Sequence, residues 1–331
     1  MTSYLANGSD VDVDPLDEVD PAFSAARLAE LAEAAGMQFP DSVLGSLTAA
    51  LRSGKHVILI GPPGTGKTTL ARLVADLGHE ALMCTGSLYA TATASWTVDE
   101  TIGSAHETAE GPCFRPGVVT ESIEKGQWLI IDEFNRADID RAFGELFTVL
   151  SDQEVVLPHR RNPFTPPVAI VPYGVEPSPE TDPILIPKPW RIIATMNTAD
   201  RGMLFSLSRA LMRRFAFVHV ASPDDDVFRD LLEGPGRIVL ELLPLREVQD
   251  IGPAMFVDAA DFAEARLADG ESPSVVLLEA FTAYFLPQLD PPDEAGTERL
   301  LAILDEVLEP PEREAARTIL GQFSVLSEPE S

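Results

Sequence analysis

The stretch "GPPGTGKTT" at residues 61–69 has the spacing of a loop that holds phosphate groups. It fits G-x-x-x-x-G-K-[S/T], with an apolar run before it and a helical pattern after it, the context this motif requires. Its glycines let backbone N–H groups close around phosphates, while the positive end of the next helix points at them. We expect Lys67 to neutralise the β- and γ-phosphates, and the Thr68 hydroxyl to bind Mg²⁺. The predicted nucleotide-binding residues are Gly61, Pro62, Pro63, Gly64, Thr65, Gly66, Lys67, Thr68 and Thr69.

An acidic pair, Asp132 and Glu133, ends the apolar run in "WLIIDEFNR". A carboxylate at the end of a buried strand has no packing role, so Asp132 is predicted to hold the Mg²⁺ shell. Glu133 is placed to orient and activate a water for attack on the γ-phosphate. An acidic pair after a strand is often only a solvated turn, but the complete phosphate loop upstream favours the catalytic interpretation.

Two further features follow in residues 191–217. Asn197 ends another apolar run, where its amide can reach the same water or the γ-phosphate; the alternative is a turn or helix-cap residue. Arg213 and Arg214 end a short helical stretch, which in a ring would face the nucleotide of the neighbouring subunit. An arginine supplied in trans stabilises the charge of the phosphoryl-transfer transition state. The alternative is that both arginines serve the helix C-terminus.

The fold that must position these residues is predicted to be α/β. Five apolar runs of strand length are nearly continuous in hydrophobicity, as strands covered on both faces are: residues 56–60, 81–85, 128–132, 191–195 and 216–220. Helical or loop segments separate them, which predicts a parallel five-stranded sheet sandwiched by helices. The proline-rich segment 157–189 is interpreted as an insertion loop, with room for a short hairpin.

The two ends of the chain differ from this middle part. Residues 1–20 carry six acidic and no basic side chains and are predicted to be a disordered tail. A helix is expected next, with Asp20 as its N-cap, Pro21 at its first position and Gly36 as its end, followed by a second helix over residues 40–54. Beyond residue 223 the pattern is helical. The predicted domains are the tail 1–20, an α/β nucleotide-binding domain 21–222 and a small acidic helical domain 223–331.

Charge and composition limit the classes of partner. The net charge is −29, and residues 221–331 carry 25 acidic against seven basic side chains, with no lysine. Such a surface repels phosphate backbones and anionic membranes, so neither nucleic-acid binding nor membrane binding is expected. Two cysteines are too few for a disulfide framework, and no signal peptide or membrane-spanning run is visible. These observations predict a cytoplasmic protein.

The order of these motifs resembles that of an AAA+ ATPase, a P-loop NTPase with a helical lid. More narrowly, "GKHVILIGPPGTGKTTLAR", "IIDEFNRADIDRAFGELFTVL" and "MNTADR" followed by "LMRRFAF" resemble the branch of the MoxR ATPases and the McrB motor, closest to the McrB type, over about residues 40–220. The resemblance implies that Asn197 and Asp200 serve hydrolysis and that Arg213 or Arg214 is the arginine finger. Arg136 is either a further interface residue or an exposed helix-start arginine.

The resemblance also suggests what lies around the site. Residues 97–103 and 113–126 are similar to the insert that this branch directs toward a central pore. Two departures stand out: the modified-DNA-binding domain of McrB-type motors does not precede the phosphate loop, and no lid arginine can be assigned as a second nucleotide sensor. Ser274 stands where a MoxR motif ends in arginine, which leaves Arg237, Arg246 and Arg266 as candidates.

The expected function is therefore a Mg²⁺-dependent NTPase that assembles into a ring, expected to be a hexamer, and remodels or drives a protein partner. A MoxR-like role implies a von Willebrand A-type partner, and a McrB-like role a nuclease subunit. A nucleotide-gated scaffold with little hydrolysis is the second class, and a P-loop kinase ranks last. ATP is the expected substrate, GTP is the alternative known in McrB, and no residue that reads the base can be named from the sequence.

Overall fold

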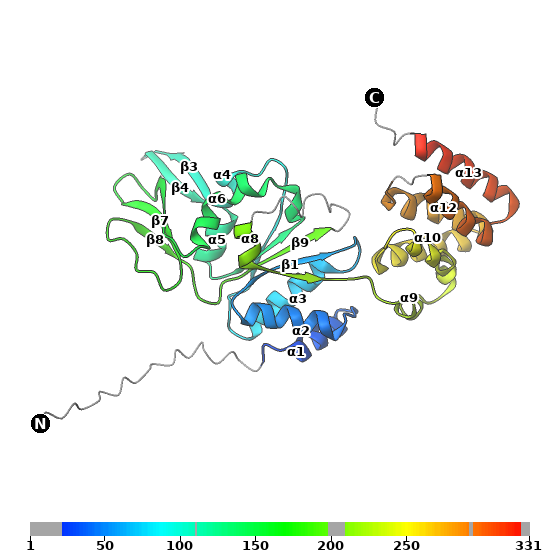
Figure 1. The fold of residues 1–331 in the computed structure, drawn as a ribbon, viewed down its shortest axis with the longest axis horizontal. Coiled ribbons are helices and arrows are strands. Elements are labelled where there is room, and N and C mark those ends of the chain that lie inside the picture. The colour runs from blue at the N-terminus through cyan, green and yellow to red at the C-terminus, as the bar shows by residue number, and fades with distance from the viewer. Residues whose placement is uncertain (1–21, 110, 198–208, 291–293, 326–331) are drawn as a thin grey trace, which may run out of the picture.

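The computed structural model describes residues 22–109, 111–197, 209–290 and 294–325. Five parallel strands form the central sheet (Figure 1), in the order β10 (Phe215–His219), β1 (His56–Gly61), β9 (Ile192–Asn197), β5 (Trp128–Asp132) and β2 (Ser87–Thr91). Gly61 at the end of β1 is paired with Asn197 at the end of β9. The carboxyl ends of the central strands therefore meet at one edge of the sheet, where the predicted site residues follow them. The α/β prediction is confirmed.

Helices cover both faces of this sheet (Figure 1). One face packs on α1 (Ala25–Ala34), α2 (Asp41–Arg52) and α3 (Lys67–Glu80). The other packs on α4 (Val98–Thr101), α5 (Val118–Glu124) and α6 (Ile139–Val149), with the hairpin β3 (Gly103–Thr108) and β4 (Gly111–Pro116) beside them. Val57 and Leu59 of β1 enter the first core, and Ile58 and Ile60 the second. The continuous apolar run thus serves two cores, because alternate side chains of a strand point to opposite faces.

The N-terminal helices form close to where the sequence predicts them. The buried face of α2 includes Val43, Leu44, Leu47 and Leu51. However, α1 begins at Ala25, and its N-cap is Ser24, whose hydroxyl accepts the Arg27 N–H at 3.2 Å. The expected cap Asp20 lies outside the described residues. Serine satisfies the first free backbone N–H groups as well as aspartate does.

The second strand lies further along the chain than predicted. Residues 81–85 form the turn that leaves α3, with Leu82 in a left-handed conformation and 85% exposed. The strand is β2 at residues 87–91, which among the described strands pairs with β5 alone. Because β2 lies at the edge of the sheet, its side chains are half-buried or exposed, and its hydrophobicity is weaker than that of the preceding turn.

The proline-rich segment is more ordered than the prediction of a loop implies. The expected hairpin forms from β6 (Val155–Arg160) and β7 (Pro167–Val171), and β8 (Asp182–Leu185) adds a third strand parallel to β7. Val168 and Ile170 are fully buried in the core that covers one face of the main sheet. Proline is tolerated because it stands at strand ends and in edge strands, where no ladder donor is lost.

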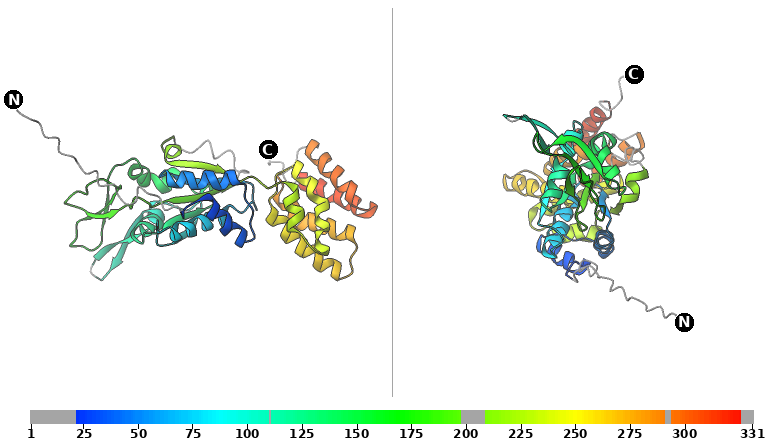
Figure 2. Two further views of the ribbon diagram at one scale, coloured as in Figure 1. Left: turned by 90° about the horizontal axis from the view of Figure 1, so that it is seen from below. Right: turned by 90° about the vertical axis from the view of Figure 1, so that its left-hand side faces the viewer.

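The C-terminal part is helical, as expected, and joins the sheet through the chain after β10 (Figure 2). Its elements are α9 (Asp225–Leu231), η3 (Pro235–Glu247), α10 (Pro253–Ala268), α11 (Pro273–Ala280), η4 (Phe281–Phe285), η5 (Leu286–Gln288), α12 (Glu294–Val307) and α13 (Pro310–Val325). Phe228, Phe256, Phe281 and Phe285 are at the centre of its core. All three tryptophans of the chain, Trp96, Trp128 and Trp190, lie instead in the α/β part.

No helix within the described ranges is long and apolar enough to cross a membrane.

Candidate active site

The phosphate loop bends sharply between β1 and α3. Gly64 and Gly66 have φ angles of +76° and +79°, a conformation that residues with a side chain rarely adopt. A Cβ on Gly66 would lie 2.2 Å from the Cε of Met37, so the segment before α2 closes directly over the loop. The loop therefore places Lys67 at the first position of α3, at the edge of the sheet where β1 ends.

Lys67 is buried, and its ammonium group donates hydrogen bonds to the Gly61 and Pro62 carbonyl oxygens at 2.9 and 2.5 Å. Burial lowers the pKa of Lys67 to about 8, although the nearby carboxylates of Glu133 and Asp132 act in the opposite direction. The group still carries its proton at pH 7. A buried cation with carbonyl partners is suited to bind an anion that enters the cavity.

Hydroxyl groups from three elements converge on the Asp132 carboxylate. Thr68 donates to Oδ1 at 2.8 Å, Thr195 donates to the same oxygen, and the Tyr89 hydroxyl donates to Oδ2 at 2.7 Å. Burial raises the pKa of Asp132, but the hydrogen bonds from Thr195, Tyr89 and Thr68 outweigh it and hold the pKa below its usual value. A carboxylate beside a threonine hydroxyl supplies the oxygen ligands that Mg²⁺ prefers, so these residues fit that ion.

Glu133 follows directly and turns its carboxylate toward β9. Asn197 donates from Nδ2 to Oε1 of Glu133 at 3.0 Å, and Arg136 approaches Oε2 at 3.4 Å. Glu133 has a φ of +55°, a strained conformation for a residue with a side chain, and its N–H is held by the Thr195 hydroxyl at 3.1 Å. Such strain is often found at functional sites, where the surrounding structure maintains it.

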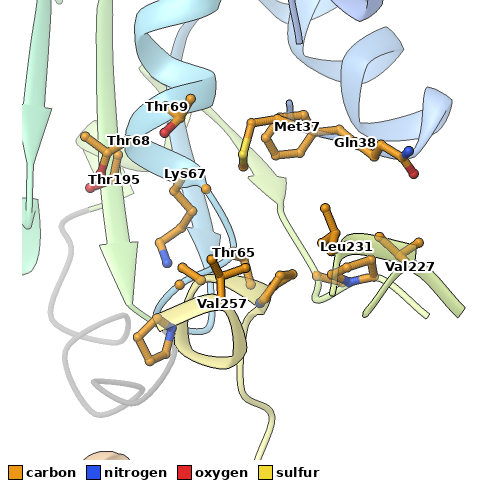
Figure 3. A pocket seen from close by; sticks show the side chains of 18 of the residues that line it. Met37, Gln38, Thr65, Lys67, Thr68, Thr69, Thr195, Val227, Leu231 and Val257 are labelled. Carbon is orange, nitrogen blue, oxygen red and sulfur yellow. The ribbon is translucent and has the colours of Figure 1, made fainter. Parts of the chain in front are cut away.

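These residues line one cavity of about 480 Å³ (Figure 3). Figure 3 shows Lys67, Thr68 and Thr195 along one side of it. Asp132, Glu133 and Asn197 belong to the same lining. Apolar residues line the cavity as well, from segments that no sequence motif connects with the site: Met37, Val227, Leu231 and Val257 (Figure 3), with Phe39 in the same lining. Apolar walls beside a phosphate site are suited to a flat base. No motif marks these residues, since each carries an ordinary apolar side chain near a helix end.

Comparison with known families gives a match over residues 56–215, to the family described as AAA domain (dynein-related subfamily). This part of the chain is an AAA domain. The match runs from the first residue of β1 to the first residue of β10 and so contains the phosphate loop, Asp132, Glu133 and Asn197. An AAA domain implies nucleotide-dependent ATPase activity, usually with Mg²⁺. A comparison with curated proteins found no match.

None of the three lid arginines lines the cavity of the AAA domain in the described structure. Arg246 pairs with Asp225 and lies over the Phe228 ring at 4.1 Å, and Arg266 pairs with Glu279 at 2.8 Å. Arg237 is exposed to solvent. Ser274 donates to Glu312 at 2.9 Å and holds two helices together.

The C-terminal helices contact the phosphate loop through the start of α10. The Gly252 N–H donates to the Pro63 carbonyl at 3.2 Å, and the Ala254 N–H to the Gly64 carbonyl at 3.4 Å. A Cβ on Gly252 would lie 2.3 Å from the Gly64 carbonyl carbon, so only glycine allows this approach. Asp258 and Val257 of the same helix line the cavity.

The remaining predicted residues lie away from the cavity or outside the described structure. Asp200 is outside the described residues. Arg213 and Arg214 end α8 (Arg209–Arg214), just before β10 and therefore at the opposite edge of the sheet from the phosphate loop. Arg213 is exposed, and Nη2 of Arg214 lies 3.8 Å from Oδ2 of Asp152. Neither arginine can serve the cavity of its own AAA domain from this position.

Proposed function

We propose that this protein is a Mg²⁺-dependent nucleoside triphosphatase, with ATP as the expected substrate, that assembles into a ring and uses hydrolysis to remodel or drive a protein partner. The observation that carries the proposal is the convergence of Lys67, Thr68, Asp132, Glu133 and Asn197 on one cavity, although they come from a helix, two strands and the turn after one of them. Structural needs do not explain such a set, since it places a cation, two carboxylates and an amide in a partly buried space.

The residues divide between binding and chemistry. Lys67 offers its charge to the β- and γ-phosphates, and the α3 N-terminus directs its free N–H groups to the same place. Thr68 and Asp132 would hold Mg²⁺, which supplies charge neutralisation across the phosphates. Tyr89 and Thr195 fix the rotation of the Asp132 carboxylate from two sides.

Glu133 is the proposed group that orients and activates the attacking water. Asn197 donates a hydrogen bond to this carboxylate at 3.0 Å. Its proposed role is therefore to hold Glu133 in the orientation that positions the water. That contact gives the Asn197 amide a more specific role than contact with the phosphate alone.

Ring assembly is supported by the place of Arg213 and Arg214. Both lie far along the sheet from the cavity of their own chain, whereas an arginine that stabilises the transition state must reach a γ-phosphate. In a ring, the arginine of one subunit could reach the γ-phosphate bound to its neighbour. A hexamer is the expected size of this ring. The β3–β4 hairpin, which projects from the body in Figure 2, is the proposed segment that engages a partner. That partner would be a von Willebrand A-type protein in a MoxR-like chaperone or a nuclease subunit in a McrB-like motor.

A nucleotide-gated scaffold with little hydrolysis is the second candidate. It is favoured by the engagement of both Glu133 oxygens, Oε1 by Asn197 and Oε2 by Arg136. If Glu133 keeps these partners when nucleotide binds, it cannot take a proton from water.

The first experiment measures steady-state hydrolysis of ATP and GTP side by side, with Mg²⁺, over a range of protein concentrations. Glu133→Gln should bind nucleotide and lose about 10²–10⁴-fold in turnover, the range typical of general acid–base groups. Lys67→Ala should lose binding. Specific activity that rises with concentration supports the ring, and a preference for GTP favours the McrB-like motor. Binding with equal, very slow turnover in wild type and Glu133→Gln would favour the scaffold.

A mixing experiment tests the arginine in trans. Arg213→Ala and Glu133→Gln, each inactive alone, should partly restore hydrolysis when mixed, because some interfaces then combine an intact arginine with an intact Glu133. No recovery, with mixed rings demonstrated by differential tagging, would contradict the geometry.

A further inference from the structure

A second cavity, of about 230 Å³, lies at the edge of the sheet opposite the phosphate loop. It is formed where three neighbouring strands begin: His56 starts β1, Arg191 precedes β9, and Arg214 precedes β10. Lys55 and Lys188 complete a lining that contains four cationic side chains. We call this space the basic cavity.

The charge of the basic cavity contrasts with that of the whole chain. The chain has a net charge of −29 and four lysines, and two of those lysines are here. Asp152 is the one carboxylate in the described lining; it is 79% exposed and lies 3.8 Å from Arg214. A concentration of cations in so acidic a protein calls for a specific explanation.

Arg191 is the most constrained of these cations, with 7% of its surface exposed. Its Nε donates to the Leu51 carbonyl at 3.1 Å, and its Nη1 donates to the Lys188 and Trp190 carbonyls, both at 2.8 Å. Within the described part of the chain, no carboxylate lies within ion-pair distance of this guanidinium. Burial lowers the pKa of Arg191 to about 10, so the group remains charged at neutral pH.

His56 provides a neutral donor beside these charges. Its Nδ1 accepts the Ile192 N–H at 2.9 Å, which leaves the ring proton on Nε2. Burial, together with the positive charges of Arg191, Lys55 and Arg214, lowers the pKa of His56 to about 3. The imidazole is therefore neutral at pH 7. The His56 ring and the side chains of Arg191, Lys55 and Arg214 line the same cavity.

Helix capping explains part of the arrangement. Arg191 caps the end of α2 through the Leu51 carbonyl, and Lys55 caps α8 through the Arg213 carbonyl at 2.9 Å. Each helix C-terminus, however, carries only about half a negative charge, and Asp152, the carboxylate in the described lining, is largely exposed. Four positive charges around one cavity match a multiply charged oxyanion better than a single carboxylate.

We propose that the basic cavity binds a small, multiply charged anion of the phosphate class, either inorganic phosphate or the phosphoryl group of a small metabolite. Arg191, Lys188, Lys55 and Arg214 supply the charge, and His56 supplies a neutral N–H. The site is separate from the nucleotide cavity, since the two lie at opposite ends of β1 and β9.

The test uses the full chain carrying Lys67→Ala, so that the phosphate loop contributes little. Isothermal titration at constant ionic strength and pH 7.5 compares inorganic phosphate, glycerol 3-phosphate and acetate. We expect one phosphate per chain, and at least tenfold weaker binding in Lys188→Glu. The matched control is Lys125→Glu, which makes the same charge change just after α5, where Lys125 is exposed and pairs with Glu121. It should leave the affinity unchanged.

The outcomes separate the sources of the anion. Tighter binding of inorganic phosphate assigns the free ion, and tighter binding of glycerol 3-phosphate assigns a metabolite. No saturable phosphate binding, equal affinity for acetate, or the same loss in both lysine variants would overturn the proposal. If Lys188→Glu lowers the melting temperature, Lys188→Gln repeats the measurement without introducing a new charge. No step uses nucleotide, so the result does not depend on the proposed hydrolysis.

Discussion

At the scale of residues, the site is organised around one carboxylate. Asp132 accepts hydrogen bonds from Thr68 on α3, Tyr89 on β2 and Thr195 on β9. The sequence predicts Asp132 and Thr68, because both belong to motifs with known chemistry. It does not predict Tyr89 or Thr195, since a tyrosine in an edge strand and a threonine in a buried strand have ordinary structural roles in most proteins.

Replacement of Tyr89 by phenylalanine tests its positioning role. The ring would stay, with the Arg72 guanidinium 4.7 Å from its centre, but the hydroxyl that holds Oδ2 would be lost. A hydrogen bond to a charged group contributes about 1.5–3 kcal/mol, and less when partly exposed as here, so we expect a several-fold rise in the Mg²⁺ concentration needed for half-maximal nucleotide binding. Titration of Mg²⁺ against nucleotide binding in the Glu133→Gln background measures this, and Tyr173→Phe serves as the control. An unchanged midpoint would exclude the role.

The lowered pKa of His56 predicts how the stability of the fold depends on pH. Its pKa is about 3 in the folded protein, against an ordinary value near 6.5, because of burial and the charges of Arg191, Lys55 and Arg214. The unfolded chain therefore takes up the proton first as the pH falls. The contribution to stability is complete above about pH 6.5 and is lost progressively toward pH 3. Urea unfolding between pH 4 and 8 should show that His56→Gln takes up about one proton fewer than wild type on unfolding below pH 6. Equal proton uptake would contradict the lowered pKa.

At the scale of elements, the central strands were predictable and the edge was not. β1, β5 and β9 are buried on both faces, and their continuous apolar runs identify them. The run at 81–85 is equally apolar but packs at the end of α3, while the true strand β2 is half-exposed. Hydrophobicity reports burial, and burial distinguishes an edge strand poorly from a helix end.

The contact between α10 and the phosphate loop also could not be predicted from the sequence. It joins Gly252 and Ala254 to Pro63 and Gly64, which are distant in the chain and are paired by backbone atoms alone. Neither pattern nor charge marks such a contact. Of the arginines considered as a second nucleotide sensor, Arg246 and Arg266 pair with carboxylates away from the cavity.

Gly252→Ala should separate α10 from the phosphate loop. The new Cβ would meet the Gly64 backbone at 2.3 Å and the Pro63 oxygen at 2.6 Å, neither of which can move without displacing the loop. We expect weaker nucleotide binding, by about tenfold, with the fold retained. Nucleotide titration and circular dichroism measure the two properties. Gly270→Ala is the control, since a Cβ there meets no atom within 4 Å, although its φ of +91° adds some local strain. Equal affinities in the two variants would show that the contact is not needed.

At the scale of the whole molecule, three apolar cores divide between two parts. Two of them cover the faces of the sheet, and their members run from Phe23 to Phe215 and Val220. The third begins at Phe228 and belongs to the helices. The connection is the chain after β10 and the contact of α10 with the phosphate loop, so the nucleotide cavity is lined by both parts.

The uneven placement of tryptophan makes this division observable. Because Trp96, Trp128 and Trp190 are all buried in the α/β part, fluorescence excited selectively at tryptophan follows that part alone, while the helical signal in far-ultraviolet circular dichroism follows both. Urea titrations read by the two methods should give separate midpoints without ligand if the parts unfold independently. A ligand that touches both parts should draw the midpoints together. The difference between the two urea midpoints therefore measures how strongly the two parts are coupled. The decrease in that difference when nucleotide is added measures how much of the coupling the nucleotide provides.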